Sequence, residues 1–370
     1  MSTHDGPEQH SGKRHLGRTL LDDLGRGDLH RSWKQDWQDL MTFYLDDEHR
    51  RRLASMNRVE RFFTRAGWIL RNLFLRLTPA RRILVGIAAV LFVLPSMDFG
   101  LRGLTLKLHL NPFSFFILLF VLMLELKDKL LAHDELEVGR EVQRALLPAD
   151  NPQLPGWDIW MYTRPANNVG GDLVDYLQVD DDRLALTLGD VAGKGLGAAL
   201  LMAKLQATLR AVVSETRDLA ELGGRVNAIL YRDGVPGKFA TLVYLELAPG
   251  SGAVKLLNAG HPPPFVLRAG GPEALEPEAP PIGILPEIAF VEQRLDLEPG
   301  DMMVVFSDGL PEAVNEAGEF FTDERVNALL PGLRPCSAAE AGNRLLWAVN
   351  DFVRHARPHD DLSLIVLKRL

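Results

Sequence analysis

Hydrophobic and polar residues follow different patterns in different parts of the chain. Residues 1–28 carry few large apolar groups, so burial cannot offset the entropy of ordering them, and we expect a disordered tail. Between Trp33 and Leu77 apolar and charged residues interleave without proline, which favours helices. An apolar stripe runs through this segment, made of Leu53, Met56, Val59, Phe63 and Leu70.

Two runs further along lack charged residues altogether. They are Ile83–Met97 and Pro112–Leu124. Each is shorter than the roughly 20 residues that span a hydrocarbon core, but apolar flanks nearly close the gap. We expect residues 83–124 to form a transmembrane helical hairpin. A buried helix pair in a soluble protein, or a re-entrant pair, is the alternative.

The charge of the preceding segment supports the membrane interpretation. Ten arginines lie between Arg50 and Arg82, and Glu60 is the only acidic residue there. For residues 29–82 this favours a basic helical juxtamembrane region lying against anionic headgroups over a solvated helix face. The positive-inside rule then puts both ends of the hairpin, and the domain that follows, on the cytoplasmic side of the inner or cytoplasmic membrane. Without the hairpin the protein would be cytoplasmic.

A helical pattern continues after the second apolar run. Apolar residues recur at intervals of seven at Leu124, Leu131, Val138 and Ala145. We expect residues 125–148 to form a connecting signalling helix that ends at the first of several prolines. The spacing suits a homodimer through residues 125–147, as a short coiled coil, and equally a helix docked on its own domain.

From Trp157 onward, short apolar runs separated by Gly, Pro and Asp indicate strands. The expected strands are Trp157–Thr163, Leu173–Val179, Leu184–Leu188, Thr241–Leu247, Val254–Leu257, Phe265–Leu267, Phe290–Leu295, Met302–Phe306 and Leu362–Leu367. The expected helices are Ala198–Ser214, Leu219–Tyr231, Asp323–Leu330 and Ala338–His355, with a surface loop over Ala269–Pro286. This order predicts an α+β domain with antiparallel sheets over residues 149–370.

Overall composition excludes some classes of function. A net charge of -8 over 370 residues argues against general nucleic-acid binding, which rewards clustered cations. The single cysteine, Cys336, excludes an intrachain disulfide and any multi-cysteine metal site.

Four acidic clusters stand at the ends of predicted strands. They contain Asp172, Asp190, Asp308 and the pair Asp360–Asp361. Carboxylates at strand ends can point into one cleft, where Mg²⁺ or Mn²⁺ would neutralise their repulsion. Two such ions about 3.5–4 Å apart can activate a water for in-line attack at phosphorus, so no nucleophilic side chain is required.

Five glycine- and aspartate-rich motifs follow one another along this part of the chain. They are Gly170-Gly171-Asp172, Gly189-Asp190-Val191-x-Gly193-Lys194-Gly195, Asn258-Ala259-Gly260-His261-Pro262-Pro263, Phe306-Ser307-Asp308-Gly309 and Asp360-Asp361-x-Ser363. In this order they resemble the metal-dependent serine/threonine protein phosphatases of type 2C, the PPM family. The closest branch is the bacterial, SpoIIE-like one that regulates sporulation and stress-response sigma factors. The resemblance implies an αββα sandwich of two antiparallel sheets flanked by helices, here preceded by a helical N-terminal region.

The resemblance also implies a metal site and a substrate. Its ligands fall on Asp172, Asp190, Asp308 and Asp360 with the backbone oxygen of Val191, and they would hold two Mn²⁺ or Mg²⁺ ions. Catalysis would run through Asp172 and Asp190 by way of the activated water. The implied substrate is a phosphoserine or phosphothreonine protein, in this branch often an anti-sigma antagonist.

Some positions near the motifs have less certain roles. Asn167 stands where eukaryotic relatives have a phosphate-binding arginine, so phosphate contact must come from the metals, with Asn167 or Asn168 as a further candidate. Lys194 is a candidate for that contact, and Asp361 is an alternative ligand to Asp360. Asp175 is a candidate for orienting the metal ligands without itself binding an ion. A structural hydrogen bond is a better expectation for His261 than a role as general acid.

The sequence therefore predicts a membrane-anchored protein phosphatase in a signalling or sigma-factor regulatory pathway. Two alternatives stay open. One is a catalytically silent phosphatase-like binding module, although such a module has no need to gather carboxylates. The other is a soluble dimeric phosphatase whose apolar runs form a buried helical interface.

Overall fold

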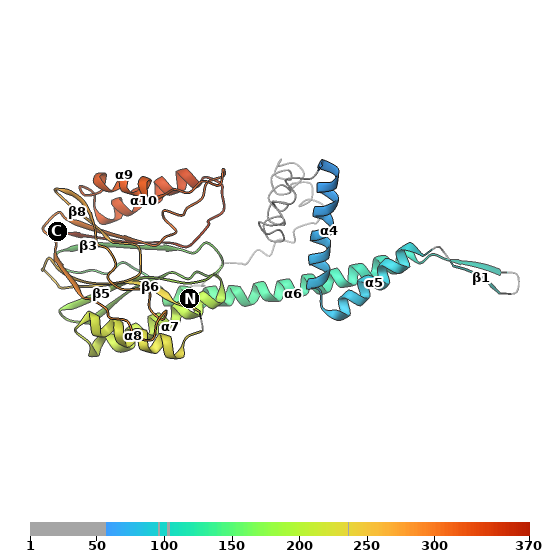
Figure 1. Ribbon diagram of the computed structural model, residues 1–370, viewed down its shortest axis with the longest axis horizontal. Helices are drawn as coiled ribbons and strands as arrows, with labels where there is room; N and C mark the ends of the chain where they lie inside the picture. Colours follow the sequence, from blue (N-terminus) through green and yellow to red (C-terminus); the bar gives the residue numbers. More distant parts are fainter. Residues whose placement is uncertain (1–56, 95–96, 102–103, 236) are drawn as a thin grey trace, which may run out of the picture. The chain divides into compact units, whose positions relative to one another are not determined.

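The computed structural model describes residues 57–94, 97–101, 104–235 and 237–370, which form two compact units divided after Lys129 (Figure 1). The predicted disordered tail and the first part of the basic region, residues 29–56, lie outside the described residues.

The first unit is helical, with one short hairpin of strands. Its elements are α4 (Arg58–Arg76), α5 (Pro79–Val93), β1 (Met97–Leu101), β2 (Leu104–Leu108) and the start of α6 (Asn111–Leu146). Helices α5 and α6 are joined at both ends of their contact. Ser114 Oγ donates to the Ala88 carbonyl at 2.7 Å, and Arg81 bonds Glu125 and Asp128 at 2.6 Å each.

Many large apolar side chains of this helix pair are exposed in the described part of the chain. Phe92, Val93, Phe116 and Leu122 are all more than three-fifths exposed. Length and composition alone pick out one described helix that could cross a membrane, Leu196–Glu215, and half of that segment is buried inside the second unit. Helix α5 has 15 residues, which is fewer than the roughly 20 that span a hydrocarbon core. The transmembrane hairpin over residues 83–124 thus stays a prediction.

Two features of this region differ from the expectation. The second apolar run and the connecting helix are one continuous helix, α6, which ends at Leu146, just before Pro148. The connection between the apolar runs contains the antiparallel pair β1–β2, which the sequence analysis did not predict. Both strands alternate apolar residues with Asp, Gly, Thr or Lys, which is a strand signal, but each is short and has no continuous apolar run.

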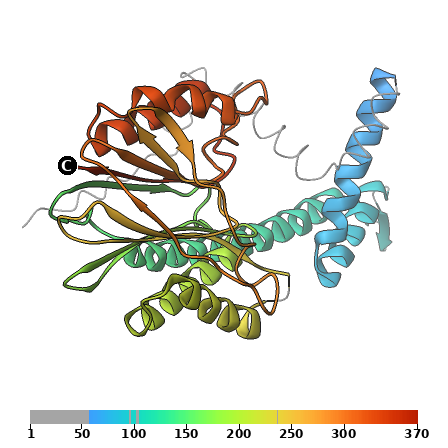
Figure 2. The same ribbon diagram turned by 60° about the vertical axis from the view of Figure 1, so that its left-hand side comes forward.

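The second unit is a sandwich of two five-stranded antiparallel sheets, which confirms the predicted αββα fold (Figures 1 and 2). One sheet has the order β10-β7-β6-β5-β4 and is covered by α7 and α8; the other has the order β3-β12-β11-β8-β9 and is covered by α9 and α10. The strands of the first sheet are β4 (Leu173–Asp180), β5 (Arg183–Val191), β6 (Ala240–Leu247), β7 (Ala253–Ala259) and β10 (Gln293–Asp296). Those of the second are β3 (Trp157–Arg164), β8 (Phe265–Arg268), β9 (Gly271–Ala274), β11 (Met302–Phe306) and β12 (Leu362–Arg369). The helices are α7 (Leu196–Val212), α8 (Leu219–Asp233), α9 (Asp323–Leu329) and α10 (Ala338–Val353).

Two predictions in this domain were wrong in detail. Strand β9 lies inside the predicted loop Ala269–Pro286, where it pairs with β8 at the sheet edge. Its residues are mostly exposed, so no apolar run marks it. Strand β10 begins at Gln293 rather than Phe290, because Phe290 leaves the sheet and packs instead against Gly223 of α8.

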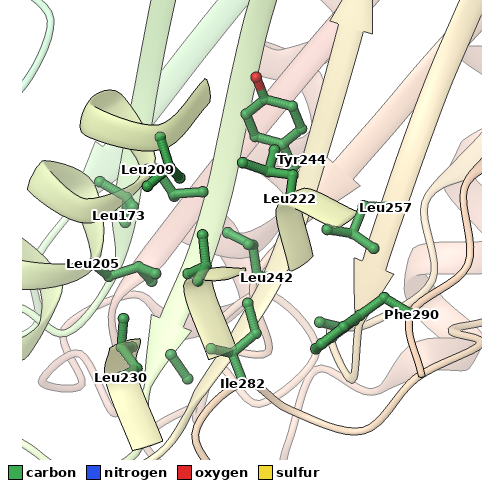
Figure 3. Packing of buried hydrophobic residues seen from close by; sticks show 14 of the residues in the cluster. Leu173, Leu205, Leu209, Leu222, Leu230, Leu242, Tyr244, Leu257, Ile282 and Phe290 are labelled. Atoms are coloured by element: carbon green, nitrogen blue, oxygen red, sulfur yellow. The ribbon is translucent and has the colours of Figure 1, made fainter. Parts of the chain in front are cut away.

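Apolar side chains fill three layers, one between the sheets and one beneath each pair of helices. Figure 3 shows the layer under α7 and α8, where Leu205 and Leu222 meet Leu242 and Leu257. The continuous apolar runs of β5, β6 and β11 arise because these strands are covered on both faces. This packing fixes the strand ends from which the acidic residues project.

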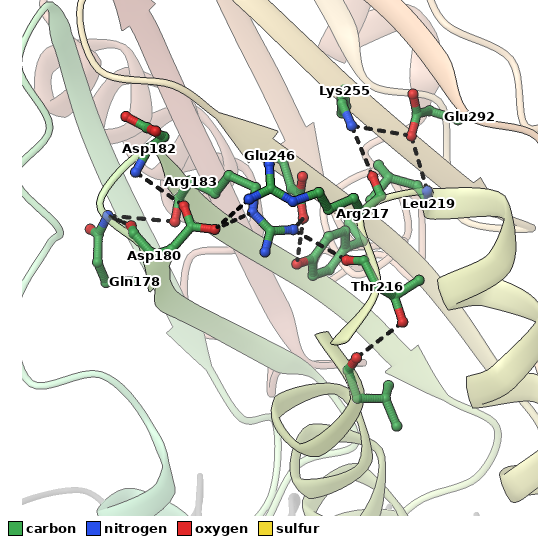
Figure 4. Close-up of polar contacts among 12 residues, drawn as sticks. Gln178, Asp180, Asp182, Arg183, Thr216, Arg217, Leu219, Glu246, Lys255 and Glu292 are labelled. Carbon is green, nitrogen blue, oxygen red and sulfur yellow. Dashed lines mark hydrogen bonds and ion pairs between the residues drawn. The ribbon is translucent and has the colours of Figure 1, made fainter. Parts of the chain in front are cut away.

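A polar network fixes the α7–α8 connection to the start of β5, the end opposite to Asp190 (Figure 4). Arg183 donates to Asp180 at 2.8 Å and to the Thr216 carbonyl at 3.2 Å, and it lies 3.4 Å from buried Glu246. Arg183 begins the strand that carries Asp190 near its other end, about 23 Å away at ordinary strand rise. The network is therefore structural and separate from the acidic clusters.

Candidate metal centre

Four aspartates from both sheets project at one end of the sandwich. Asp172 immediately precedes β4, and Asp190 is the last residue but one of β5. Asp308 follows β11 by two residues, and Asp360 precedes β12 by two. Because β4 pairs with β5 and β11 pairs with β12, both antiparallel, each pair of aspartates falls at one end of its strand pair.

Asp361 joins the two strand pairs. Its Oδ1 accepts from the Ala166 N–H at 2.7 Å, and its Oδ2 accepts from the Gly171 N–H at 2.5 Å. The Asp308-Gly309 turn lies so close to the Asp361 carbonyl that a side chain at Gly309 would not fit. Both carboxylate oxygens of Asp361 thus serve the backbone, which favours Asp360 over Asp361 as a metal ligand.

Burial and the charges of neighbouring carboxylates raise the pKa values of these carboxyl groups. The pKa of Asp190 is raised to about 7, first by burial and then by the charges of Asp308 and Asp360. The pKa of Asp308 is raised to about 6, by burial and then by Asp360 and Glu312. Burial, followed by the charge of Asp190, also raises the pKa of Asp172 well above its usual range. Such mutual repulsion is what a bound divalent cation relieves.

The donor set fits a hard divalent ion. Asp172 Oδ2 is buried and has no hydrogen-bond partner in the described part of the chain. A Cβ on Gly171 would lie 3.1 Å from the Val191 carbonyl oxygen and 3.5 Å from Asp190 Oδ1, so the glycine lets these oxygens border one space beside Asp172. Carboxylate and carbonyl oxygens are the ligands that Mg²⁺ and Mn²⁺ prefer.

The side chains are not already arranged around an ion. Within the described ranges, no three or more His, Cys, Asp and Glu side chains converge closely enough to hold one. The Lys194 ammonium lies 2.9 Å from Asp360 Oδ2 and donates to the His359 carbonyl at 2.9 Å. A cation therefore already neutralises Asp360 here, and an ion binding at Asp360 would have to displace it.

The other predicted residues take varied places. His261 is buried, with Nδ1 2.8 Å from Thr241 Oγ1, and burial lowers its pKa to about 3, so the ring is neutral. This geometry fits the expected structural role. Asp175 forms a two-bond ion pair with Arg210 of α7, at 2.6 and 2.8 Å, and so ties β4 to that helix. Asn167 is exposed in the loop before Asp172.

Two contributions to this end of the domain were not predicted from the sequence. The Ser307 hydroxyl donates to the Asp361 carbonyl at 3.2 Å and accepts from the Ser363 N–H at 3.0 Å, which locks the start of β12 to the end of β11. Gln143 of α6 bonds the Gly170 backbone. A serine beside a motif aspartate is a usable signal, whereas a glutamine in a charged helix gives none.

A surface hollow of about 690 Å³ lies elsewhere in the domain. Phe321, Arg325 and Phe352 are among the residues that line it, and none of the four aspartates does. The hollow is therefore separate from the acidic cluster.

Comparison with known proteins agrees with this geometry. Residues 180–370, just over half of the chain, match the family of Stage II sporulation protein E (SpoIIE). The chain is 31% identical over 220 residues to Protein IcfG of Synechocystis, an alignment that covers 52% of this chain and 35% of IcfG. It is 28% identical over 240 residues to the phosphoserine phosphatase RsbU of Bacillus subtilis, covering 64% of this chain and 70% of RsbU. The chain thus spans about a third of IcfG and about two thirds of RsbU.

Solved structures support the same fold. The RsbU and RsbW domains of a Mycobacterium tuberculosis protein superpose with a TM-score of 0.50 at 28% identity, covering 60% of this chain and 63% of that one. The SiaA-PP2C domain of Pseudomonas aeruginosa superposes with a TM-score of 0.57 at 19% identity, covering 66% of this chain and 98% of that domain. The chain therefore belongs to the SpoIIE family, and its C-terminal part is a protein phosphatase domain of the PP2C type.

Proposed function

We propose that this domain hydrolyses phosphoserine or phosphothreonine on a regulatory partner protein, with two Mn²⁺ or Mg²⁺ ions held by Asp172, Asp190, Asp308, Asp360 and the Val191 carbonyl. The observation that carries the proposal is the position of four aspartates from two sheets at the ends of paired strands, and the raised pKa values of Asp172, Asp190 and Asp308 support it. Burying like charges together costs stability, and a binding surface has no need for it. The names of RsbU and a second Bacillus subtilis relative, RsbP, as phosphoserine phosphatases support the same activity.

The chain's own residues would bind the ions and orient the substrate. When bound, the two ions activate a water molecule and neutralise the oxygens of the phosphate group. Asp190, between the other acidic groups, would contribute to holding both ions. Asp361 keeps the Gly171 backbone in place, so Asp172 enters the site from a fixed direction.

Phosphate binding would rely on residues at the rim of the site. Asn167 stands where eukaryotic relatives have an arginine, and Lys194 can supply a cation instead, because its ammonium lies 2.9 Å from Asp360 Oδ2. Its ammonium can leave Asp360 for the phosphate when an ion occupies the carboxylate, since the Lys194 side chain is half exposed. The exposed Asn167 can add a neutral hydrogen bond to the same group.

The N-terminal unit would place this activity at a membrane and in a signalling pathway. Exposed phenylalanines and leucines on α5 and α6 support the transmembrane hairpin over residues 83–124, with the catalytic domain cytoplasmic. Leu131, Val138 and Val142 form an exposed apolar stripe on α6, which supports a homodimer through residues 125–147. An anti-sigma antagonist is the partner that the family favours, within sigma-factor regulation.

A soluble dimeric phosphatase is the second candidate, because the same exposed apolar side chains could pack against another copy. Extraction of the full chain from cell membranes separates the two. The membrane proposal predicts that detergent releases the chain and that high salt does not. Release without detergent would favour the soluble dimer.

The activity is tested by hydrolysis of p-nitrophenyl phosphate and of a phosphoserine peptide by residues 125–370 with Mn²⁺. This fragment contains the whole second unit. Asp190→Asn keeps the shape of the side chain but removes its charge, and should lower the rate at least about 100-fold. Asp181→Asn, in the exposed turn after β4, is the matched control and should leave the rate unchanged. Equal rates for Asp190→Asn and the control would contradict the proposal, and no activity at all would favour the silent binding module.

A further inference from the structure

A second lysine, Lys238, lies beside the loop that follows Asp190. Its ammonium group donates to the Ala192 carbonyl at 3.0 Å. The Ala192 N–H in turn donates to the Phe239 carbonyl at 2.9 Å, which continues the pairing of β5 with β6 beyond Val191. Backbone pairing therefore holds Lys238 next to Val191, whose carbonyl oxygen is a proposed ligand.

Gly193 makes room for the ammonium group of Lys238. Its φ is 119°, a conformation that L side chains rarely adopt, and a Cβ there would collide with Lys238 Nζ. Lys194 is the next residue, about 3.8 Å away along the backbone. The two lysines thus meet at one turn of the backbone.

The positive charge of Lys238 is available to a ligand. Among the residues that the structure describes, no carboxylate forms an ion pair with it, and its acceptor is the neutral Ala192 carbonyl. An ammonium group has three donors, so donors are left over. Lys238 is also exposed, so an anion can reach it from solvent. Lys194 differs, because its ammonium group pairs with Asp360 at 2.9 Å.

We propose that Lys238 and Lys194 form one subsite for the phosphate group of the substrate, at the turn that Gly193 makes. This inference rests on the proposed function, because it takes the phosphate group to lie at the ions beside Val191. A phosphate monoester carries about two negative charges at neutral pH and three acceptor oxygens, which two ammonium groups match. Lys238 can bind the phosphate group at once, whereas Lys194 must first leave Asp360. The subsite would favour monoesters over singly charged diesters.

The test compares two lysines that each donate to a backbone carbonyl. Lys238→Met removes the proposed phosphate contact. Lys204→Met is the matched control, since Lys204 donates to the Asp233 carbonyl and lies about 12 Å along α7 from its first residue. Each full-length chain, in mild detergent with saturating Mn²⁺, hydrolyses p-nitrophenyl phosphate while inorganic phosphate is added as a competitive inhibitor. The KM for a phosphoserine peptide is measured on the same samples.

We expect Lys238→Met to weaken inhibition by phosphate about 5- to 10-fold and to raise the KM for the peptide by a similar factor, as loss of one exposed charge-assisted contact would. Lys204→Met should stay within about 2-fold of the unsubstituted chain, because an exposed charge at that distance is largely screened. Lys238→Arg keeps the charge and should retain most of the inhibition. Added salt should weaken inhibition less in Lys238→Met than in the unsubstituted chain. If Lys238→Met does not fold, Lys238→Gln carries the test, because its amide can still donate to the Ala192 carbonyl.

Equal inhibition of Lys238→Met and Lys204→Met by phosphate would overturn the inference alone. So would a higher KM for the peptide with unchanged inhibition by phosphate, because Lys238 would then contact another part of the peptide. Absence of hydrolysis by the unsubstituted chain would overturn the proposed function as well.

Discussion

Asp190→Asn should stabilise the metal-free domain while abolishing its activity. In the folded domain the pKa of Asp190 is about 7, against a usual value of 3.8. Between these two values the folded state binds more protons than the unfolded state, so the free energy of unfolding falls as pH rises. The charge of Asp190 therefore destabilises the metal-free protein at neutral pH, and the asparagine does not.

The two pKa values set the size of this effect. By linkage, the raised pKa of Asp190 lowers the free energy of unfolding by about 1.7 kcal/mol at pH 5 and by about 4 kcal/mol at pH 8, relative to a group whose pKa does not change on folding. The advantage of Asp190→Asn should therefore grow by about 2–3 kcal/mol over this range. Other groups whose protonation changes on unfolding cancel in the difference between the two proteins, provided that they lie away from Asp190.

Urea unfolding of residues 125–370 in EDTA, at unit steps from pH 5 to pH 8, measures this difference. With Mn²⁺ the order should reverse at pH 8, because the ion binds the native aspartate and stabilises the folded state. A difference between Asp190→Asn and the unsubstituted fragment that stays constant from pH 5 to pH 8 would refute the reasoning. So would a metal-free Asp190→Asn less stable than the unsubstituted fragment at pH 8.

Three further substitutions test other parts of the account. Burial lowers the pKa of His261 to about 3, so on acidification the unfolded state takes up this proton before the folded state does. The free energy of unfolding should therefore fall as pH drops from about 6.5. In His261→Gln, urea unfolding should show a smaller decrease of this free energy between pH 7 and pH 5. Asp175→Asn breaks the pair with Arg210, whose side chain is about half exposed, and should cost about 1–3 kcal/mol of stability while calorimetry shows unchanged Mn²⁺ affinity. An affinity loss there would instead support the predicted role of Asp175 in ordering the site. Lys194→Met removes the cation that pairs with Asp360, so calorimetry should show tighter Mn²⁺ binding. Kinetics should show a higher KM for a phosphoserine peptide. Weaker Mn²⁺ binding would contradict the idea that an ion at Asp360 must displace Lys194.

The apolar pattern identified strands of this domain because they are covered on both faces, whereas the sandwich arrangement was implied by the family resemblance. Met302–Phe306 is apolar throughout and Leu362–Leu367 has Ser363 as its one polar residue, and such runs can be read without knowing their partners. Strands β1 and β9 escaped because each is short and carries no apolar run. Their pairing depends on a partner strand, which no local pattern specifies.

The acidic site was predictable only to the level of its motifs. Glycine turns at strand ends mark the four aspartates, but the distinction between Asp360 and Asp361 depends on which carboxylate the Ala166 and Gly171 amides face. Those amides are about 190 residues away in the sequence. The partner of Asp175 on α7 is likewise a matter of packing. The contact of Gln143 with Gly170 has the same origin, and a helix pattern gives its face but not its neighbour.

The central claim is that carboxylates from two sheets hold a pair of metal ions, and counting the ions tests it most directly. Titration calorimetry of residues 125–370 with Mn²⁺ should give two ions per chain. Asp172→Asn and Asp308→Asn should each lose at least one of them, whereas Asp181→Asn should retain both. Saturation with fewer than two ions by the unsubstituted fragment, or an unchanged count in both site variants, would contradict the account.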